Sequence, residues 1–351
     1  MRTSLLLPII IATTLTACST SKPAEQEAES SGGADQQPVD PPQADQQQVD
    51  QQQVDQQQAD ERTDDVIDIA IDAEAIALEG ERVVELADWE VPEEHLPEER
   101  FGLYITPLGE AVGKAVERQI LKAKNPNFTP VAEFRTSALT PYELLAQTMY
   151  TAGSNKVSRF VVRVDRKVGH ATQPNKADEE ATPTTKLPST ADPQPKEPLD
   201  LTIVVVDKGF RIAATGAILA PIEGCPKVGP TICLQDPSAD VMKLIGQARQ
   251  ARNAGKIAEA DEHLAEAMAL YDFRRLYNLL ADLGQKYPST SVFRLSADAD
   301  MPMAIVDHVR QIARSELPKD SYADNEAFQQ ALDKTPANDE LFADPVFSIV
   351  R

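Results

Sequence analysis

Short stretches of alternating apolar and polar residues between positions 66 and 165 predict half-buried strands. Residues 66–71 alternate after their first pair, and an apolar run at 75–78 ends at Glu79-Gly80, so these two stretches predict a strand pair. Two further strands are predicted, at 129–136 and 157–164. The apolar spacing becomes helical after Thr106-Pro107, and Thr106 is expected to be the N-cap of this helix. A second helix is predicted after Thr140-Pro141, and it is expected to end at Gly153.

A similar order of elements is predicted after residue 199. A nearly continuous apolar strand at 201–206 is followed by a strand at 210–214, and later by a helix, a strand, a helix and a final strand, around 276–283, 292–295, 305–312 and 346–350. Each half therefore predicts a layered α/β unit of the α+β kind, a small βαβ-type sheet with helices on one face.

An insertion at 238–270 is rich in Ala and Glu and predicts helices. Its stretch from Ala254 to Met268 resembles one tetratricopeptide unit, but one unit cannot bury its own apolar face. We therefore favour a plain helical hairpin.

The two halves share a spacing. Val131 and Pro141 are ten positions apart, and so are Val292 and Pro302; at that offset Phe134 matches Leu295. This register suggests internal duplication of residues 66–165 in 199–351. Convergent use of the same strand–loop–helix pattern would produce a similar spacing, and both interpretations stay open.

Two segments lack the pattern of a folded core. Residues 19–65 contain three copies of a five-residue unit, DQQQV, DQQQV and DQQQA, and we expect a disordered acidic tether there. Residues 166–198 contain six prolines and predict a linker between the two folded segments.

The N-terminus is typical of an exported protein. Arg2 precedes an apolar run at 5–11, which is too short to span a membrane, and small residues follow. Leu15-Thr16-Ala17-Cys18 resembles the lipobox of bacterial lipoproteins, which implies a signal peptide over 1–18 and a covalent lipid (palmitate among its acyl chains) on Cys18 that anchors the protein to a membrane. Ser19, where an Asp would indicate inner-membrane retention, favours the outer membrane facing the periplasm. The alternative is an ordinary cleaved signal with an incidental Cys18.

Charge and motifs exclude several classes of function. With 34 Lys+Arg against 56 Asp+Glu, the net charge of −22 argues against binding to nucleic acid. G-x-S-x-G, P-loop and G-x-G-x-x-G motifs are missing, and none of the four histidines, His95, His170, His263 and His308, has a histidine four positions away. We therefore expect no enzyme, no metal and no cofactor other than the lipid.

Two cysteines near a predicted hairpin suggest a disulfide. Cys225 and Cys233 lie eight positions apart in a Gly/Pro-rich loop, and an oxidising compartment would favour their pairing. Metal binding is the alternative, but it needs more ligands at regular spacing.

Polar residues beside the two Pro-marked helix starts have structural and chemical interpretations. Thr140, Pro141 and Glu143 form a capping-box pattern. Asp298 and Asp300 precede Pro302 and could act as a carboxylate pair in acid–base chemistry or cation binding; we favour Asp300 as a helix cap and Asp298 as a turn residue. Trp89 and Phe101 flank an acidic loop that is either a partner surface or merely solvated.

Seven short segments share features with one known family, namely residues 139–142, 149–153, 200–210, 287–288, 295–302, 305–307 and 341–346. Together they resemble the periplasmic domain of the ExbD/TolR biopolymer-transport family, in its longer, myxobacteria-like form. The resemblance implies dimerisation and contact with peptidoglycan or with TonB/TolA-like proteins. The family's N-terminal transmembrane helix, which carries an aspartate for proton-driven work, has no counterpart in this sequence.

The sequence therefore predicts a non-enzymatic lipoprotein of the cell envelope. Its ExbD/TolR-like domains would bind Tol/Ton-type proteins or the cell wall in an energised transport system, and a homodimer is one expected form. The alternative is a structural spacer that links the outer membrane to peptidoglycan without a role in transport.

Overall fold

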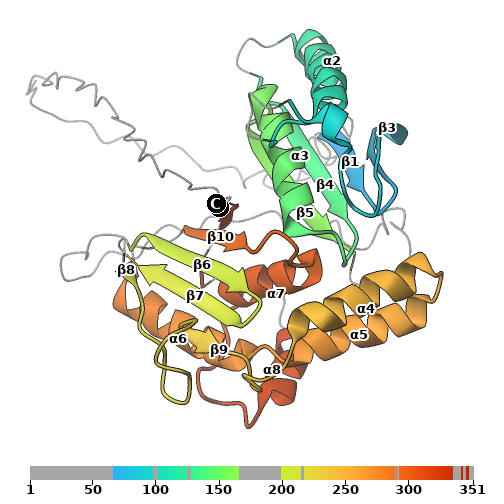
Figure 1. Cartoon of the computed structure of the whole chain (residues 1–351). Helices are drawn as coiled ribbons and strands as arrows, with labels where there is room; N and C mark the ends of the chain where they lie inside the picture. The colour runs from blue at the N-terminus through green and yellow to red at the C-terminus, as the bar shows by residue number, and fades with distance from the viewer. Residues whose placement is uncertain are drawn as a thin grey trace, which may run out of the picture. The chain divides into compact units, whose positions relative to one another are not determined.

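The computed structural model describes residues 66–97, 102–124, 128–165, 199–214, 217–288, 290, 292–334, 341–342 and 345–347. The predicted signal, tether and linker, at 1–18, 19–65 and 166–198, lie outside the described residues. All described residues belong to one compact unit. They form two mixed sheets with their helices, which confirms the predicted α+β class built on two sheet units (Figure 1).

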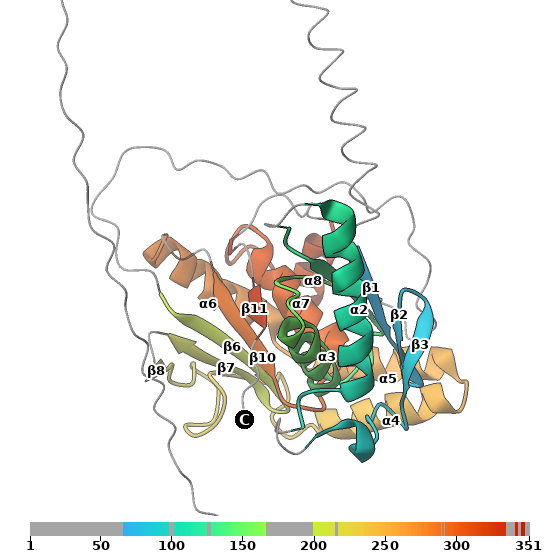
Figure 2. The ribbon, with the colours of Figure 1, turned by 90° about the horizontal axis from the view of Figure 1, so that it is seen from above.

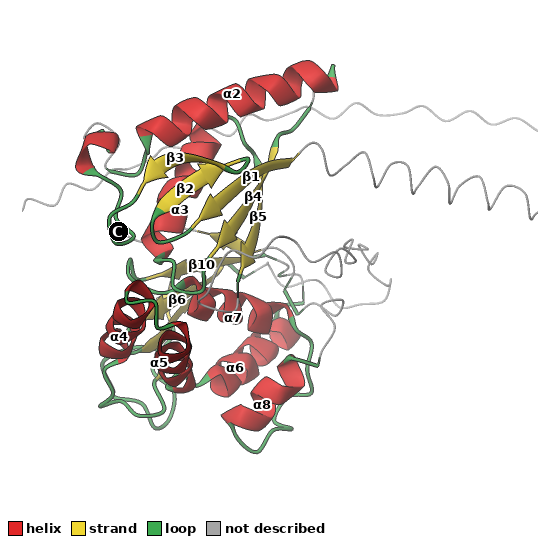
Figure 3. Ribbon diagram, turned by 90° about the vertical axis from the view of Figure 1, so that its right-hand side faces the viewer, coloured by secondary structure: helices red, strands yellow, loops and turns green. Residues whose placement is uncertain are grey.

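The first sheet has the order β3-β2-β1-β4-β5. Its strands are β1 (Val66–Ile71), β2 (Ala75–Leu78), β3 (Glu81–Glu85), β4 (Val131–Thr136) and β5 (Arg159–Val164). Alternate residues of β1 and β4 are buried, as the period of two requires. Two helices, α2 (Thr106–Ala123) and α3 (Tyr142–Ser154), cover that face (Figure 3). The other face carries cross-strand ion pairs, such as Arg135 Nε to Asp68 at 2.8 Å, so one face is apolar and one polar.

The second sheet follows the path β8-β7-β6-β10-β11, and β9 pairs with β7 beside it. Its strands are β6 (Leu201–Val206), β7 (Gly209–Ala214), β8 (Ala217–Ile218), β9 (Ile232–Cys233), β10 (Phe293–Ala297) and β11 (Pro345–Phe347). In Figure 1, β6 and β7 lie in front of α6 (Phe273–Lys286) and α7 (Met303–Arg314). A further helix, α8 (Asn325–Leu332), packs on α6 through Phe328 and Tyr277, whose ring centroids are 5.4 Å apart.

Both sheets are built from the same unit. In each, an antiparallel hairpin (β1–β2, β6–β7) is followed by two parallel strands (β4 and β5, β10 and β11). In the first sheet, α2 precedes β4 and α3 precedes β5. In the second, α6 and α7 take these places, α8 follows α7, and the insertion at 238–270 precedes α6. Phe134 pairs with Ile69 in the first sheet, and Leu295 pairs with Ile203 in the second; all four side chains are fully buried. The matched positions Phe134 and Leu295 therefore occupy the same place in two ββαβαβ repeats, which we call repeat 1 and repeat 2.

A helical hairpin interrupts repeat 2, as expected for the insertion at 238–270. It consists of α4 (Val241–Asn253), whose N-cap Asp240 accepts a hydrogen bond from the amide of Lys243, and α5 (Ile257–Ala269). Figures 1 and 2 show the hairpin reaching from repeat 2 to the β1–β3 side of repeat 1. Specific contacts, described below, fix α4 there.

The turn between β6 and β7 requires a glycine at position 209. Its φ is +133°, and a Cβ at this position would lie 2.0 Å from the carbonyl oxygen of Ile232 in β9. Only glycine allows both this backbone conformation and the close approach of β9.

Some predicted boundaries were wrong. Thr106 is the first helical residue of α2 and not its N-cap, which is Ile105; the amide of Ile105 instead donates to the hydroxyl of Thr151 at 2.9 Å. Gly153 lies inside α3, which continues to Ser154 with Asn155 as C-cap. Parallel strands β4 and β5 begin two residues later than expected, β10 extends to Ala297, and the last strand starts at Pro345. Five short elements were not predicted: β3, the 3-10 helix at Glu93–His95, β8, β9 and α8.

Candidate functional site

The first turns of α3 and α7 meet at an isolated antiparallel bridge between Pro141 and Pro302. The amide of Tyr142 donates to the carbonyl of Met301 at 2.8 Å, and the amide of Met303 donates to the carbonyl of Thr140 at 2.9 Å. One residue further along each helix, the same exchange repeats, from Glu143 to Ala299 at 3.0 Å and from Ala304 to Ala138 at 2.9 Å. The first amides of a helix have no partner inside the helix, so each repeat caps the helix of the other.

This exchange overturns the predicted side-chain caps. The N-cap of α3 is Pro141 and that of α7 is Pro302, and neither helix has a side-chain cap hydrogen bond. The capping box of Thr140 and Glu143 is therefore wrong, and so is the role of Asp300 as a cap. The physical reason is that carbonyls of the opposite repeat already accept from these amides. Thr140 is fully buried, and its Oγ1 has no hydrogen-bond partner among the described residues.

Asp298 is a turn residue, as predicted, but most of its hydrogen bonds go to the β6–β7 hairpin. Its carboxylate accepts from the amide of Asp207 at 3.1 Å, and its own amide donates to Val205 at 2.9 Å. Its carbonyl also accepts from Met301 at 2.9 Å within the turn before α7. Asp298 thus joins the β6–β7 turn to the inter-repeat contact.

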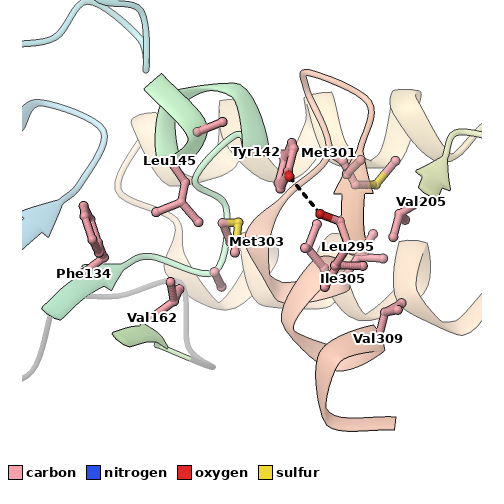
Figure 4. Close-up of a cluster of buried hydrophobic side chains, with 14 of the residues drawn as sticks. Phe134, Tyr142, Leu145, Val162, Val205, Leu295, Met301, Met303, Ile305 and Val309 are labelled. Atoms are coloured by element: carbon pink, nitrogen blue, oxygen red, sulfur yellow. Dashed lines mark hydrogen bonds between the residues drawn. The ribbon is translucent and has the colours of Figure 1, made fainter. Parts of the chain in front are cut away.

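Buried apolar side chains continue the contact between the repeats. Tyr142 is 2% exposed, and its hydroxyl donates to the carbonyl of Leu295 in β10 at 3.1 Å (Figure 4). Met303 of repeat 2 and Leu145 of repeat 1, both fully buried, belong to the same cluster. The structure therefore brings together six residues that the sequence placed in two separate helix starts, namely Thr140, Pro141, Glu143, Asp298, Asp300 and Pro302.

A cleft of about 600 Å³ opens beside this contact. Three groups of residues line it: the loop after β3, the first turns of α3, and one face of α4, with Asp300 from the turn before α7. Its apolar lining comes from Trp89, Val91, Leu96, Pro141 and Leu144, and its carboxylates from Asp88, Glu90, Glu143 and Asp300. The cleft combines apolar surface with several carboxylates, and we treat it as the candidate site.

A strained turn forms one wall of the cleft. Ala87 and Glu90 exchange backbone hydrogen bonds of 3.0 and 3.1 Å around Asp88 and Trp89, whose φ angles are 59° and 72°. Two positive φ angles are typical of a type I′ turn, which is strained for a bulky residue. Helix α4 holds the turn: Asn253 donates to the carboxylate of Asp88, and the guanidinium of Arg252 lies 5.2 Å from the centre of the indole ring.

Arg249 ties α4 to both repeats. Its guanidinium donates to the carbonyl of Asp300 in repeat 2 at 2.9 Å and to the carbonyl of Leu139 in repeat 1 at 3.5 Å. Burial lowers the pKa of Arg249, and the nearby carboxylates of Asp300 and Asp88 oppose that shift. Its Nε and the indole Nε1 of Trp89 are buried and have no hydrogen-bond partner within the described ranges. The wall of the cleft thus contains desolvated donors held by packing.

The remaining predicted residues lie elsewhere. Cys225 and Cys233 form a disulfide with Cα atoms 5.6 Å apart, which fastens the loop before β9 to the strand that pairs with β7. Cys18, Phe101 and His170 lie outside the described residues. Sequence reasoning missed the role of α4, although Arg249, Arg252 and Asn253 share a helix face at spacings of three and four. The turn at Asp88 and Trp89 carries no glycine or asparagine that would have marked it.

Comparisons with known proteins found no relative of this chain. No protein-family model, curated protein or solved structure matches the chain. Within the described residues, no three His, Cys, Asp or Glu side chains are placed to hold a metal ion, and no helix has the length and hydropathy needed to cross a membrane.

Proposed function

We propose that this chain is a non-enzymatic, lipid-anchored protein of the cell envelope whose two repeats bind partner proteins or peptidoglycan in an energised transport system. The observation that carries the proposal is the repetition of one ββαβαβ unit in which the turn and helix start at 139–142 and at 295–302 occupy equivalent places. These are the segments that resemble the ExbD/TolR family.

The arrangement of the repeats supports a binding role. The family resemblance implies paired domains, and here two units pair within one chain through backbone hydrogen bonds at Tyr142 and Met303. A lipid on Cys18 would replace the family's transmembrane helix, since several acyl chains anchor a protein stably. Proton coupling through an intramembrane aspartate is not part of the proposal.

Crosslinking in intact cells tests this function. An affinity-tagged full-length chain should recover a Tol/Ton-type protein or peptidoglycan fragments after crosslinking. Its Cys18→Ala variant should incorporate no labelled palmitate and should leave the membrane fraction. Recovery of no envelope component, or the absence of palmitate from the wild type beside a labelled lipoprotein control, would contradict the proposal.

The acidic segment at 19–65 favours a second function, that of a structural spacer. The tether that the sequence predicts there would have a root-mean-square reach of roughly 40 Å, enough to hold a folded body away from a membrane. Deletion of the gene should then loosen the envelope, measured as leakage of periplasmic protein, without reducing uptake of a Ton-dependent nutrient. Loss of uptake would favour the transport role.

A further inference from the structure

The rim of the cleft carries an uncompensated negative charge. Asp88, Glu90, Glu143 and Asp300 line it, and all four residues are exposed. Arg249 is the cation among the lining residues, but its guanidinium donates to backbone carbonyls, and its nearest distance to the carboxylate of Asp300 is 3.9 Å. The carboxylates outnumber the guanidinium, so a cationic group at the rim would meet a favourable field.

Two of these carboxylates differ from the others. Asp88 accepts from Asn253 and Asp300 lies near Arg249, whereas the side chains of Glu90 and Glu143 make no hydrogen bond or ion pair with another residue in the described part of the chain. Exposed carboxylates elsewhere in repeat 1 form ion pairs with an arginine, as Glu79 does with Arg118. Glu90 and Glu143 therefore remain available to a ligand.

We call the apolar, largely buried part of the lining the floor of the cleft. Val91, Pro141 and Leu144 are buried residues of two different elements, and Leu96 adds a half-buried side chain. A lysine side chain matches this pattern, because its aliphatic stem covers apolar surface while its ammonium group reaches carboxylates at the rim. The volume of about 600 Å³ holds several side chains of an extended peptide.

We propose that this cleft binds a lysine-bearing segment of a partner protein, with the aliphatic stems on the floor and the ammonium groups at Glu90 and Glu143. The inference rests on the proposed function, because it takes the occupant to be a protein partner. Charge complementarity is the argument for a cationic segment, and the shape of the cleft is the argument for an extended one.

Tryptophan fluorescence gives a reporter confined to this site, because Trp89 is the one tryptophan of the chain and lines the cleft. The probe is an acetylated, amidated octapeptide of alternating Lys and Val, and the control probe has Glu in place of Lys. The Lys peptide should change the emission saturably, and raising the salt from low to high concentration should weaken its binding. The Glu peptide should leave the emission unchanged.

Matched charge variants separate the cleft from the general attraction of an acidic protein for a cationic peptide. The double variant Glu90→Gln/Glu143→Gln should bind the Lys peptide about fivefold more weakly, since exposed charge pairs are individually weak. The double variant Glu81→Gln/Glu110→Gln changes the net charge equally in a different groove, between β3 and α2, and should bind like the wild type. Circular-dichroism melts of both variants should match the wild type, because all four glutamates are exposed.

Three results would overturn the inference: no emission change with the Lys peptide, equal weakening by both double variants, or binding unaffected by salt. This outcome is distinguishable from failure of the proposed function. If the peptide binds as expected but crosslinking recovers no envelope component, the cleft assignment stands and the envelope function fails. If crosslinking succeeds and the peptide does not bind, the partner binds elsewhere and only this inference fails.

Discussion

The backbone amide of Tyr142 donates a hydrogen bond to the carbonyl of Met301, 2.8 Å away and in the other repeat. Its counterpart runs in the opposite direction, from Met303 to Thr140, at 2.9 Å. Each helix start thus depends on a carbonyl that only the other repeat supplies. Two sheets that could have been independent domains are joined through the first turns of α3 and α7, and the cleft forms beside that junction.

The hydroxyl of Tyr142 is expected to stabilise the junction. Tyr142→Phe removes the buried hydrogen bond from its hydroxyl to the carbonyl of Leu295 in the other repeat. We expect the free energy of unfolding to fall by about 1–2 kcal/mol in urea titrations. Tyr150→Phe is the matched control, because Tyr150 is 40% exposed, and it should change stability by less than about 0.5 kcal/mol.

Tryptophan fluorescence and far-ultraviolet circular dichroism should report the same shift of the urea midpoint in Tyr142→Phe. Emission of Trp89 follows repeat 1, while far-ultraviolet circular dichroism follows the helices of both repeats. Their midpoints should shift together, since the junction joins both repeats. A shift seen by fluorescence alone would contradict this coupling.

The mutual capping can be tested by removing one amide. Met303→Pro deletes the donor to Thr140, and proline is otherwise tolerated at the first position of a helix. Met303→Leu keeps the amide and nearly the same volume, so it controls for the buried side chain. We expect the Pro variant to be less stable than the Leu variant by about 1–3 kcal/mol in urea titrations. Equal stability of the two variants would show that the carbonyl of Thr140 does not need this donor.

The disulfide between Cys225 and Cys233 should contribute to stability although it closes a short loop. In the chain-entropy model, a loop between cysteines eight positions apart contributes about 2–3 kcal/mol. Reduction with dithiothreitol should lower the urea midpoint of the wild type, and a Cys225→Ser/Cys233→Ser variant should match the reduced wild type. A variant that is as stable as the oxidised protein would contradict the prediction.

Tyr271 should make the protein sensitive to alkaline pH. Its hydroxyl is buried and donates to the carbonyl of Val206 at 3.0 Å; burial raises its pKa, and the charges of Asp207 and Asp298 raise it further. The unfolded phenol ionises near pH 10. The contribution of the protonated phenol to stability is therefore complete below about pH 10 and is lost as the pH rises above that value.

The test compares the wild type with Tyr271→Phe in urea titrations at about pH 9 and pH 11. The Phe variant should be less stable by about 1 kcal/mol at pH 9, because it loses the hydrogen bond, but its stability should fall less steeply with pH. Burial also raises the pKa of Tyr277, so some alkaline loss should remain in the variant. If the stability of both proteins fell equally with pH, Tyr271 would be excluded as a source of the alkaline loss of stability.

Local patterns in the sequence predicted much of the fold. The strand at Val66–Ile71 follows from alternation, because a period of two places successive side chains on opposite faces of a sheet. The pairing of Cys225 with Cys233 follows from their proximity along the chain. Even the shared register of Phe134 and Leu295 is a property of the sequence, since it depends only on spacing, and the structure places both residues in equivalent ladders.

Only the tertiary structure decided how the helices begin and where the cleft lies. Thr140 and Glu143 have the residue types of a capping box, yet the amides that they would cap bond to carbonyls near residue 300. No local pattern can reveal an acceptor that distant, because a hydrogen bond depends on position in space and not on separation in sequence. The same reason applies to the contact of Arg252 with Trp89, which holds a strained turn of repeat 1 against a helix inserted in repeat 2.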